Sequence, residues 1–174
     1  MKKPVKFLGI MIFFLVIVFL FQTPVLTENV GAAAGIKVLS IPAPAFEMPG
    51  EQVTYGNNGS LWLNEKAEYV RAPLILPHKT RIKKIQLICK DNHVENNVRM
   101  WVHVLSNDMS ESFTLCLVRS DSASDDFRIF TTTDISPNKI DNVKYNYFLN
   151  LHIPGTKEDG LVFLAAKVWY KGSW

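Results

Sequence analysis

The chain has 174 residues, 48% of them hydrophobic, and a formal net charge of +3. Three of its 19 basic residues precede residue 7 and one of its 16 acidic residues precedes Gly35, which leaves 16 basic and 15 acidic residues from Gly35 onward. The positive balance therefore belongs mainly to the N-terminus and does not argue for nucleic acid or acidic ligands, so we expect no nucleic acid as a partner. The 140 residues after it suit one domain with a real core.

The N-terminus pairs a basic start with an apolar run. Lys2, Lys3 and Lys6 precede an unbroken apolar stretch from Phe7 to Phe21. Such a stretch is typical of an export signal or a membrane anchor rather than of a soluble fold. We therefore predict a signal peptide or a retained transmembrane helix over residues 1–26.

The two readings of the leader place the rest of the chain similarly. We expect a linker over residues 27–35 and a domain over residues 36–174 outside the cytoplasm. Cleavage near Ala34, where small residues gather, would release a secreted protein. Retention would instead anchor the domain to the membrane, with the membrane as a partner.

Beyond the linker, the hydrophobic pattern has a period of two rather than 3.6. Apolar and polar residues alternate in five segments, although Ile88 interrupts the first. The predicted core-facing series are Ile85-Leu87-Cys89, Val98-Met100-Val102-Val104, Phe113-Leu115-Leu117, Tyr145-Tyr147-Leu149-Leu151-Ile153 and Val162-Leu164-Ala166-Val168-Tyr170. This alternation indicates antiparallel strands that pack one face on a shared core.

Turn-forming residues separate these strands. Asn57-Asn58-Gly59 tolerates positive φ and predicts a tight turn between strands at 53–55 and 61–63. Ser, Asn, Asp and Pro fill the other gaps, including residues 120–126. The predicted fold class is all-β: a two-sheet antiparallel β-sandwich, jelly-roll or immunoglobulin-like, after an N-terminal hydrophobic helix.

Several short motifs in this order carry a resemblance. Ile41-Pro42-Ala43, Asp91-Asn92 and Asp141-Asn142-Val143-Lys144-Tyr145 are similar to turns and strand edges of a β-sandwich domain of unknown function in exported bacterial proteins. The resemblance spans almost all of the predicted domain. It implies a fold and an extracytoplasmic setting, and it assigns no chemistry to any residue.

The two cysteines leave a choice open. Cys89 shares the parity of core-facing Leu87, whereas Cys116 shares that of Val118 and opposes the Phe113–Leu117 face. Two sulfurs on opposite faces cannot meet without a register change, so we expect two small apolar residues. The alternative is a disulfide, which an oxidising compartment would permit.

An enzyme is not expected. The four histidines lie in different predicted elements, and the chain contains no His-x-x-x-His, Cys-x-x-Cys, Gly-x-Ser-x-Gly or glycine-rich phosphate motif. We therefore expect no catalytic residue and no cofactor. A hydrolase with a dispersed, motif-free site stays open as an alternative.

One acidic loop contains candidate metal ligands. Asp121, Asp125 and Asp126 lie close together among serines, and carboxylate oxygens suit Ca²⁺. The same residue types also form ordinary solvated turns. We expect the turn and keep calcium as the alternative.

The binding hypothesis rests on tryptophans with the wrong parity for a core. Trp101 lies between Arg99 and His103, and Trp169 lies on the mixed face of the last strand. Exposed indoles beside polar groups stack on sugar rings or anchor protein partners, unless a loop covers them. We predict a non-catalytic extracytoplasmic β-sandwich with a binding or structural role at the cell surface, a carbohydrate-binding module being the alternative.

Overall fold

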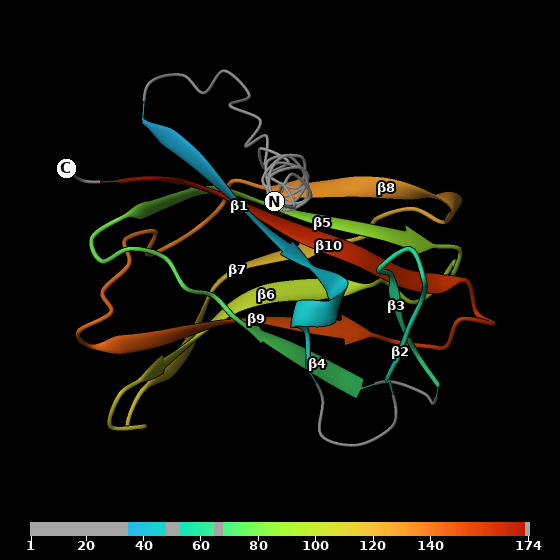
Figure 1. Ribbon diagram of the computed structural model, residues 1–174, viewed down its shortest axis with the longest axis horizontal. Coiled ribbons are helices and arrows are strands. Elements are labelled where there is room, and N and C mark those ends of the chain that lie inside the picture. The colour runs from blue at the N-terminus through green and yellow to red at the C-terminus, as the bar shows by residue number, and fades with distance from the viewer. Residues whose placement is uncertain (1–34, 48–52, 65–67, 173–174) are drawn as a thin grey trace, which may run out of the picture. The chain divides into compact units, whose positions relative to one another are not determined.

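The computed structural model describes residues 35–47, 53–64 and 68–172. The predicted leader of residues 1–26 and nearly all of the predicted linker lie outside the described residues, so those two predictions stay predictions. The described residues form an all-β, antiparallel, two-sheet sandwich (Figure 1). The predicted fold class is confirmed for them. Among them, no helix is long and apolar enough to cross a bilayer.

The first layer, sheet A, has six strands. Five of them pair in the order β2, β3, β10, β5, β8, and β1 also pairs with β10. Their bounds are β1 Ile36–Pro42, β2 Val53–Tyr55, β3 Leu61–Leu63, β5 Arg81–Asp91, β8 Ser124–Thr132 and β10 Leu161–Lys171. A 3-10 turn, η1, covers Ala43–Ala45 after β1.

The second layer, sheet B, has four strands in the order β4, β9, β6, β7. Their bounds are β4 Glu68–Pro73, β6 Arg99–Ser106, β7 Ser112–Arg119 and β9 Tyr145–Ile153. Figure 1 shows β8, β5 and β10 in one layer and β6, β9 and β4 in the other. Each sheet therefore has an inner face toward the other sheet and an outer face away from it.

The inner faces form one hydrophobic core. Val102, Val104, Leu149 and Leu151 of sheet B and Leu87 of sheet A are fully buried. This burial of apolar surface is the main stabilising contribution to the fold.

Alternation predicted the central strands well, because each buries one face completely. β5, β6 and β9 place their predicted apolar series inside, with Tyr145 at the start of β9 only partly buried. The predicted hairpin is also present: β2 pairs antiparallel with β3, and Gly59 between them has φ +77°.

A β-bulge in β7 overturns the predicted parity of that strand. The register slips opposite Val102 and His103, so that Leu115 and Cys116 are both buried while Leu117 is 49% exposed. Because a bulge shifts every later side chain to the other face, the prediction that Leu117 faces the core was wrong. Cys116 faces the core instead.

The bulge also removes the argument that separated the two cysteines by face. Cys89 and Cys116 are both buried, and both thiols are free. Burial raises the pKa of the Cys116 thiol to about 11 and that of the Cys89 thiol still further. Both therefore carry their protons at neutral pH and pack as small apolar groups.

A second bulge changes the last strand. The register of β10 on β5 slips between Phe163 and Ala165, so Phe163 is fully buried although its parity predicted the mixed face. Its ring packs edge-to-face on Phe46, with 4.8 Å between the ring centroids. Strands β1, β4 and β8 were not predicted, and β8 begins at Ser124, inside the predicted 120–126 loop.

Candidate ligand-binding groove

The outer face of sheet B carries the side chains that alternate with its core residues. In one row across the sheet, Arg71 of β4 pairs with Asn150 of β9, which pairs with Trp101 of β6. In the next row, Pro73 pairs with Phe148, which pairs with His103. Directly opposite residues point to the same side of a sheet, so these three strands build one continuous surface.

This surface is hollowed into a groove of about 1020 Å³. Its apolar residues are mostly aromatic and its polar residues include both donors and acceptors. The lining residues are Glu47, Tyr69, Arg71, Pro73, Trp101, His103, Phe148 and Asn150. A concave, largely apolar surface with a few placed polar groups is the usual form of a small-ligand site.

Arg71 is held in place on the groove floor. Its Nε donates a hydrogen bond to Oδ1 of Asn150 at 3.0 Å, and its guanidinium carbon lies 5.1 Å from the centroid of the Phe148 ring. One of the five guanidinium N–H groups is thus used, and among the described residues the terminal ones form no hydrogen bond, so they can donate to a ligand. The amide nitrogen of Asn150 offers a further donor beside them.

Two aromatic rings of the groove, Tyr69 and Trp101, lie beside each other, and Tyr69 also contacts His152 next to the groove. Tyr69 stands edge-on to Trp101 at 5.6 Å between centroids and lies tilted against His152 at 4.8 Å. Tyr69 is 59% exposed and Trp101 is half-buried. Among the described residues no cation lies over the Trp101 ring. An apolar ring face is therefore available to a ligand.

The wall of the groove beside β4 comes from the segment that follows β1 and η1, which is distant from β4 in the sequence. Glu47, just after η1, exchanges two backbone hydrogen bonds with Arg71, at 2.8 and 3.0 Å. Phe46, next to it, is anchored in the core against Phe163. The Glu47 backbone is thus held against β4, and its exposed side chain lines the groove with a carboxylate acceptor.

His103 is the titratable group on the floor. Burial, with Arg71 nearby as a smaller cause, lowers the pKa of His103 below its ordinary value. The imidazole is therefore neutral at pH 7 and offers one donor and one acceptor nitrogen. Its Nε2 lies 3.3 Å from the Ser112 hydroxyl.

That contact does not make a hydrolase site. A serine nucleophile needs a histidine base that is itself oriented by a third group. Among the described residues no carboxylate contacts His103. The described residues therefore contain no Ser-His-acid arrangement in the groove, and the dispersed-site alternative gains no support there.

Sheet A presents its tryptophans differently. Trp169 pairs with Lys84, whose Nζ lies 3.8 Å from the ring centroid, so Trp169 is on the outer face opposite to Trp101. Lys157 Nζ likewise lies 4.2 Å from the centroid of Trp62, in a smaller hollow of about 570 Å³. Lysines therefore cap both rings of this sheet.

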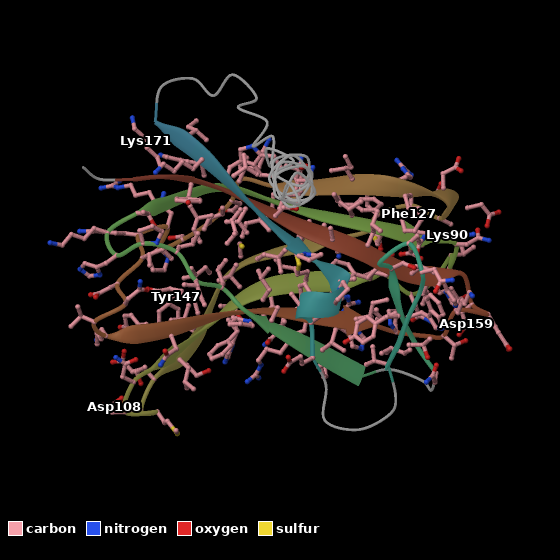
Figure 2. The ribbon with its side chains drawn as sticks, in the orientation of Figure 1. Lys90, Asp108, Phe127, Tyr147, Asp159 and Lys171 are labelled. Atoms are coloured by element: carbon pink, nitrogen blue, oxygen red, sulfur yellow. The ribbon has the colours of Figure 1, made fainter. Side chains whose placement is uncertain are left out.

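Trp169 and Trp101, both predicted binding residues, lie on opposite outer faces and so share no single site. The hollow beside Trp62 is also lined by Lys90 and Phe127, which Figure 2 shows at the end of the sandwich opposite to Lys171. Of the four predicted binding residues, Trp101 and His103 line the groove and Arg99 lies next to it on β6.

The acidic loop does not gather its carboxylates. Asp125 forms an ion pair with Lys90 at 3.1 Å and accepts a hydrogen bond from Asn92 at 2.9 Å. Asp121 accepts one from Ser122, and Asp126 lies within β8. In the part of the chain that the structure describes, no group of three or more His, Cys, Asp or Glu side chains is placed to hold a metal ion.

Most residues that line the groove were not predicted from the sequence. Tyr69 and Arg71 alternate with buried Val70 and Ala72, so period two was present in β4, but the strand was too short to recognise. Phe148 and Asn150 alternate with Leu149 and Leu151 in a predicted strand, which assigned them to the outer face without showing their neighbours. Glu47 gave no signal, because its place depends on a backbone bridge to β4.

Comparison with known proteins gives a likeness of fold. No protein-family model matches the chain, and no curated protein matches it. A solved xylan-binding module, CBM15, is 11% identical at a TM-score of 0.50, covering 80% of this chain and 99% of that chain. Two further carbohydrate-binding modules are similar at lower scores.

One is the CBM36-1 domain of a multidomain xylanase from the hindgut metagenome of Trinervitermes trinervoides, 14% identical at a TM-score of 0.47, covering 79% of this chain and 99% of that chain. The other is the C-terminal CBM6 of a marine laminarinase from Zobellia galactanivorans, 12% identical at 0.48, covering 76% and 98%. At 11% identity the likeness to CBM15 concerns the fold alone, which is the β-sandwich expected from the sequence.

Proposed function

We propose that the protein binds a polysaccharide chain in the groove on the outer face of sheet B, without catalysing its cleavage. The observation that supports this proposal most directly is the open aromatic surface of Trp101 and Tyr69 beside the N–H donors of Arg71 and Asn150. A sugar ring has an apolar face that stacks on an aromatic ring and a rim of hydroxyls that exchange hydrogen bonds. The groove offers a partner for each.

The shape supports a chain rather than a small free sugar. The groove extends over β4, β9 and β6, and polar and aromatic residues lie together in two successive rows across these strands. The fold likeness to a xylan-binding module agrees with this proposal, but the residues of the groove carry it.

We place this activity outside the cytoplasm as part of the same proposal. The support is the basic start and apolar run of Phe7–Phe21 in the sequence. Mass spectrometry of the mature protein distinguishes the two forms, because a first residue at Gly35 marks cleavage and an intact N-terminus marks an anchor.

Affinity electrophoresis in gels that contain single polysaccharides tests the binding proposal. The full-length chain is kept in a detergent without a sugar headgroup, and Trp101→Ala is compared with Trp169→Ala. We expect Trp101→Ala to weaken binding by about tenfold or more, as for other aromatic stacking contacts with ring ligands. Trp169→Ala should leave affinity unchanged. Equal loss in both variants, or no retardation of the native protein by any polymer, would overturn the proposal.

A further inference from the structure

A row of basic side chains crosses sheet B at the end of the groove. Arg99 of β6 is directly opposite Arg119 of β7 on one side and His152 of β9 on the other. Tyr69 of β4 completes the row, opposite His152. Both arginines are exposed on the outer face. Directly opposite side chains have Cβ atoms about 5 Å apart, so the two arginine side chains leave neighbouring points on the same face.

This pair carries an uncompensated charge. Like charges directly opposite one another destabilise a sheet. In the described part of the chain, neither Arg99 nor Arg119 forms an ion pair with an aspartate or glutamate. Lys90 on sheet A, by contrast, has Asp125 at 3.1 Å. The pair therefore offers two positively charged groups that an external anion can neutralise.

The pair is continuous with the aromatic floor. Arg99 precedes Trp101 by two residues on the same face of β6, a separation of about 7 Å along a strand. That is close to the length of one sugar unit. Tyr69, which contacts Trp101, lies in the same row as Arg99. A chain stacked on these rings therefore places its next unit beside the arginines.

We infer that the ligand is an acidic polysaccharide, whose carboxylate or sulfate group binds between Arg99 and Arg119 while its sugar rings occupy the groove. This inference rests on the proposed glycan-binding function. Planar guanidinium groups match both anions through paired N–H donors, which gives geometric selectivity beyond simple attraction.

Matched polymers that differ only in charge test the inference. The full-length chain, in a detergent without a sugar headgroup, is titrated with polygalacturonate and its methyl ester, with glucuronoxylan and its carboxyl-reduced form, and with dextran sulfate and dextran. The first two pairs report carboxylate recognition and the third reports sulfate recognition. We expect the acidic member of at least one pair to bind about tenfold more tightly, as for a charge-assisted hydrogen bond.

Arginine variants locate the charge dependence. Arg99→Gln and Arg119→Gln should each remove about tenfold of the affinity for the acidic polymer and leave the affinity for its neutral partner unchanged. Both residues are exposed, so both variants are expected to fold, and thermal unfolding checks this. Arg81→Gln, an equally exposed arginine at the start of β5 on sheet A, is the matched control and should change neither affinity.

The outcomes separate this inference from the proposed function. Equal affinity for the acidic and neutral members of every pair that binds would overturn the acidic ligand and leave glycan binding standing. An equal effect of Arg81→Gln would reduce the result to general attraction and would also overturn the inference. Failure of every polymer to bind would overturn both proposals.

Discussion

The two outer faces of this sandwich differ in what lies over their tryptophans. On sheet A, Lys84 and Lys157 cap the rings of Trp169 and Trp62 at 3.8 and 4.2 Å. On sheet B, Tyr69 stands edge-on beside Trp101, and among the described residues no cation covers that ring. A tryptophan with outward parity can therefore receive a stacked ligand only where its neighbours leave the ring face open.

The largest loss of stability is expected from truncating a core residue that supports both sheets. Phe163→Ala removes a fully buried ring of sheet A that holds Phe46, and with it the Glu47 wall of the sheet B groove. We expect the free energy of unfolding to fall by about 3–5 kcal/mol, as for other buried aromatic truncations. Chemical denaturation measures it, and a loss below that of an exposed variant such as Ile75→Ala would contradict the packing described.

The next largest effects are expected from removing one cation–ring contact on each sheet, Arg71 over Phe148 on sheet B and Lys84 over Trp169 on sheet A. Arg71→Met keeps an apolar stem but removes the donor to Asn150, which is 8% exposed and would lose its partner. We expect a loss of about 1–3 kcal/mol in stability, together with weaker glycan binding.

Lys84→Met is the matched change on sheet A. It removes the ammonium over Trp169, so stability should fall by only about 0.5–1 kcal/mol. Glycan affinity should not change. Equal effects of the two substitutions on glycan affinity would end the distinction between the faces.

The smallest expected effect is on the dependence of stability on pH. Burial is the larger cause that lowers the pKa values of His103 and His152. The positive charge of Arg71 lowers the pKa of His103 further, and that of Arg99 lowers the pKa of His152 further. The unfolded chain therefore takes up protons first. The stability that neutral imidazoles contribute is fully present above pH 6.5, the ordinary histidine value, and is lost as pH falls below it toward the lower folded values.

The double variant His103→Gln, His152→Gln isolates this contribution. Both histidines lie on strands of sheet B, so the variant should flatten the stability profile between about pH 7 and pH 5. Thermal unfolding at several pH values measures it. A wild-type slope that the variant leaves unchanged would assign the dependence to other groups.

Whether a strand could be predicted from the sequence depended on how completely one of its faces is buried. β5, β6 and β9 were predicted because each buries one face fully, so hydrophobicity alternates along it. β8 was not, because six of its nine residues are exposed and it pairs only with β5 among the described strands. Of the residues that line the groove, only Trp101 and His103 were predicted, because they alternate with core residues along their strand.

By itself, the sequence determined the all-β class, the central strands and the outward side of Trp101, because period-two burial is a local property of the chain. The tertiary structure decided which residues meet. Arg71 bonds Asn150 from 79 positions away, Glu47 reaches β4 through a backbone bridge, and two bulges reassigned Cys116 and Phe163 to the core. These depend on strand pairing and register, and alternation along one strand carries no information about its partner.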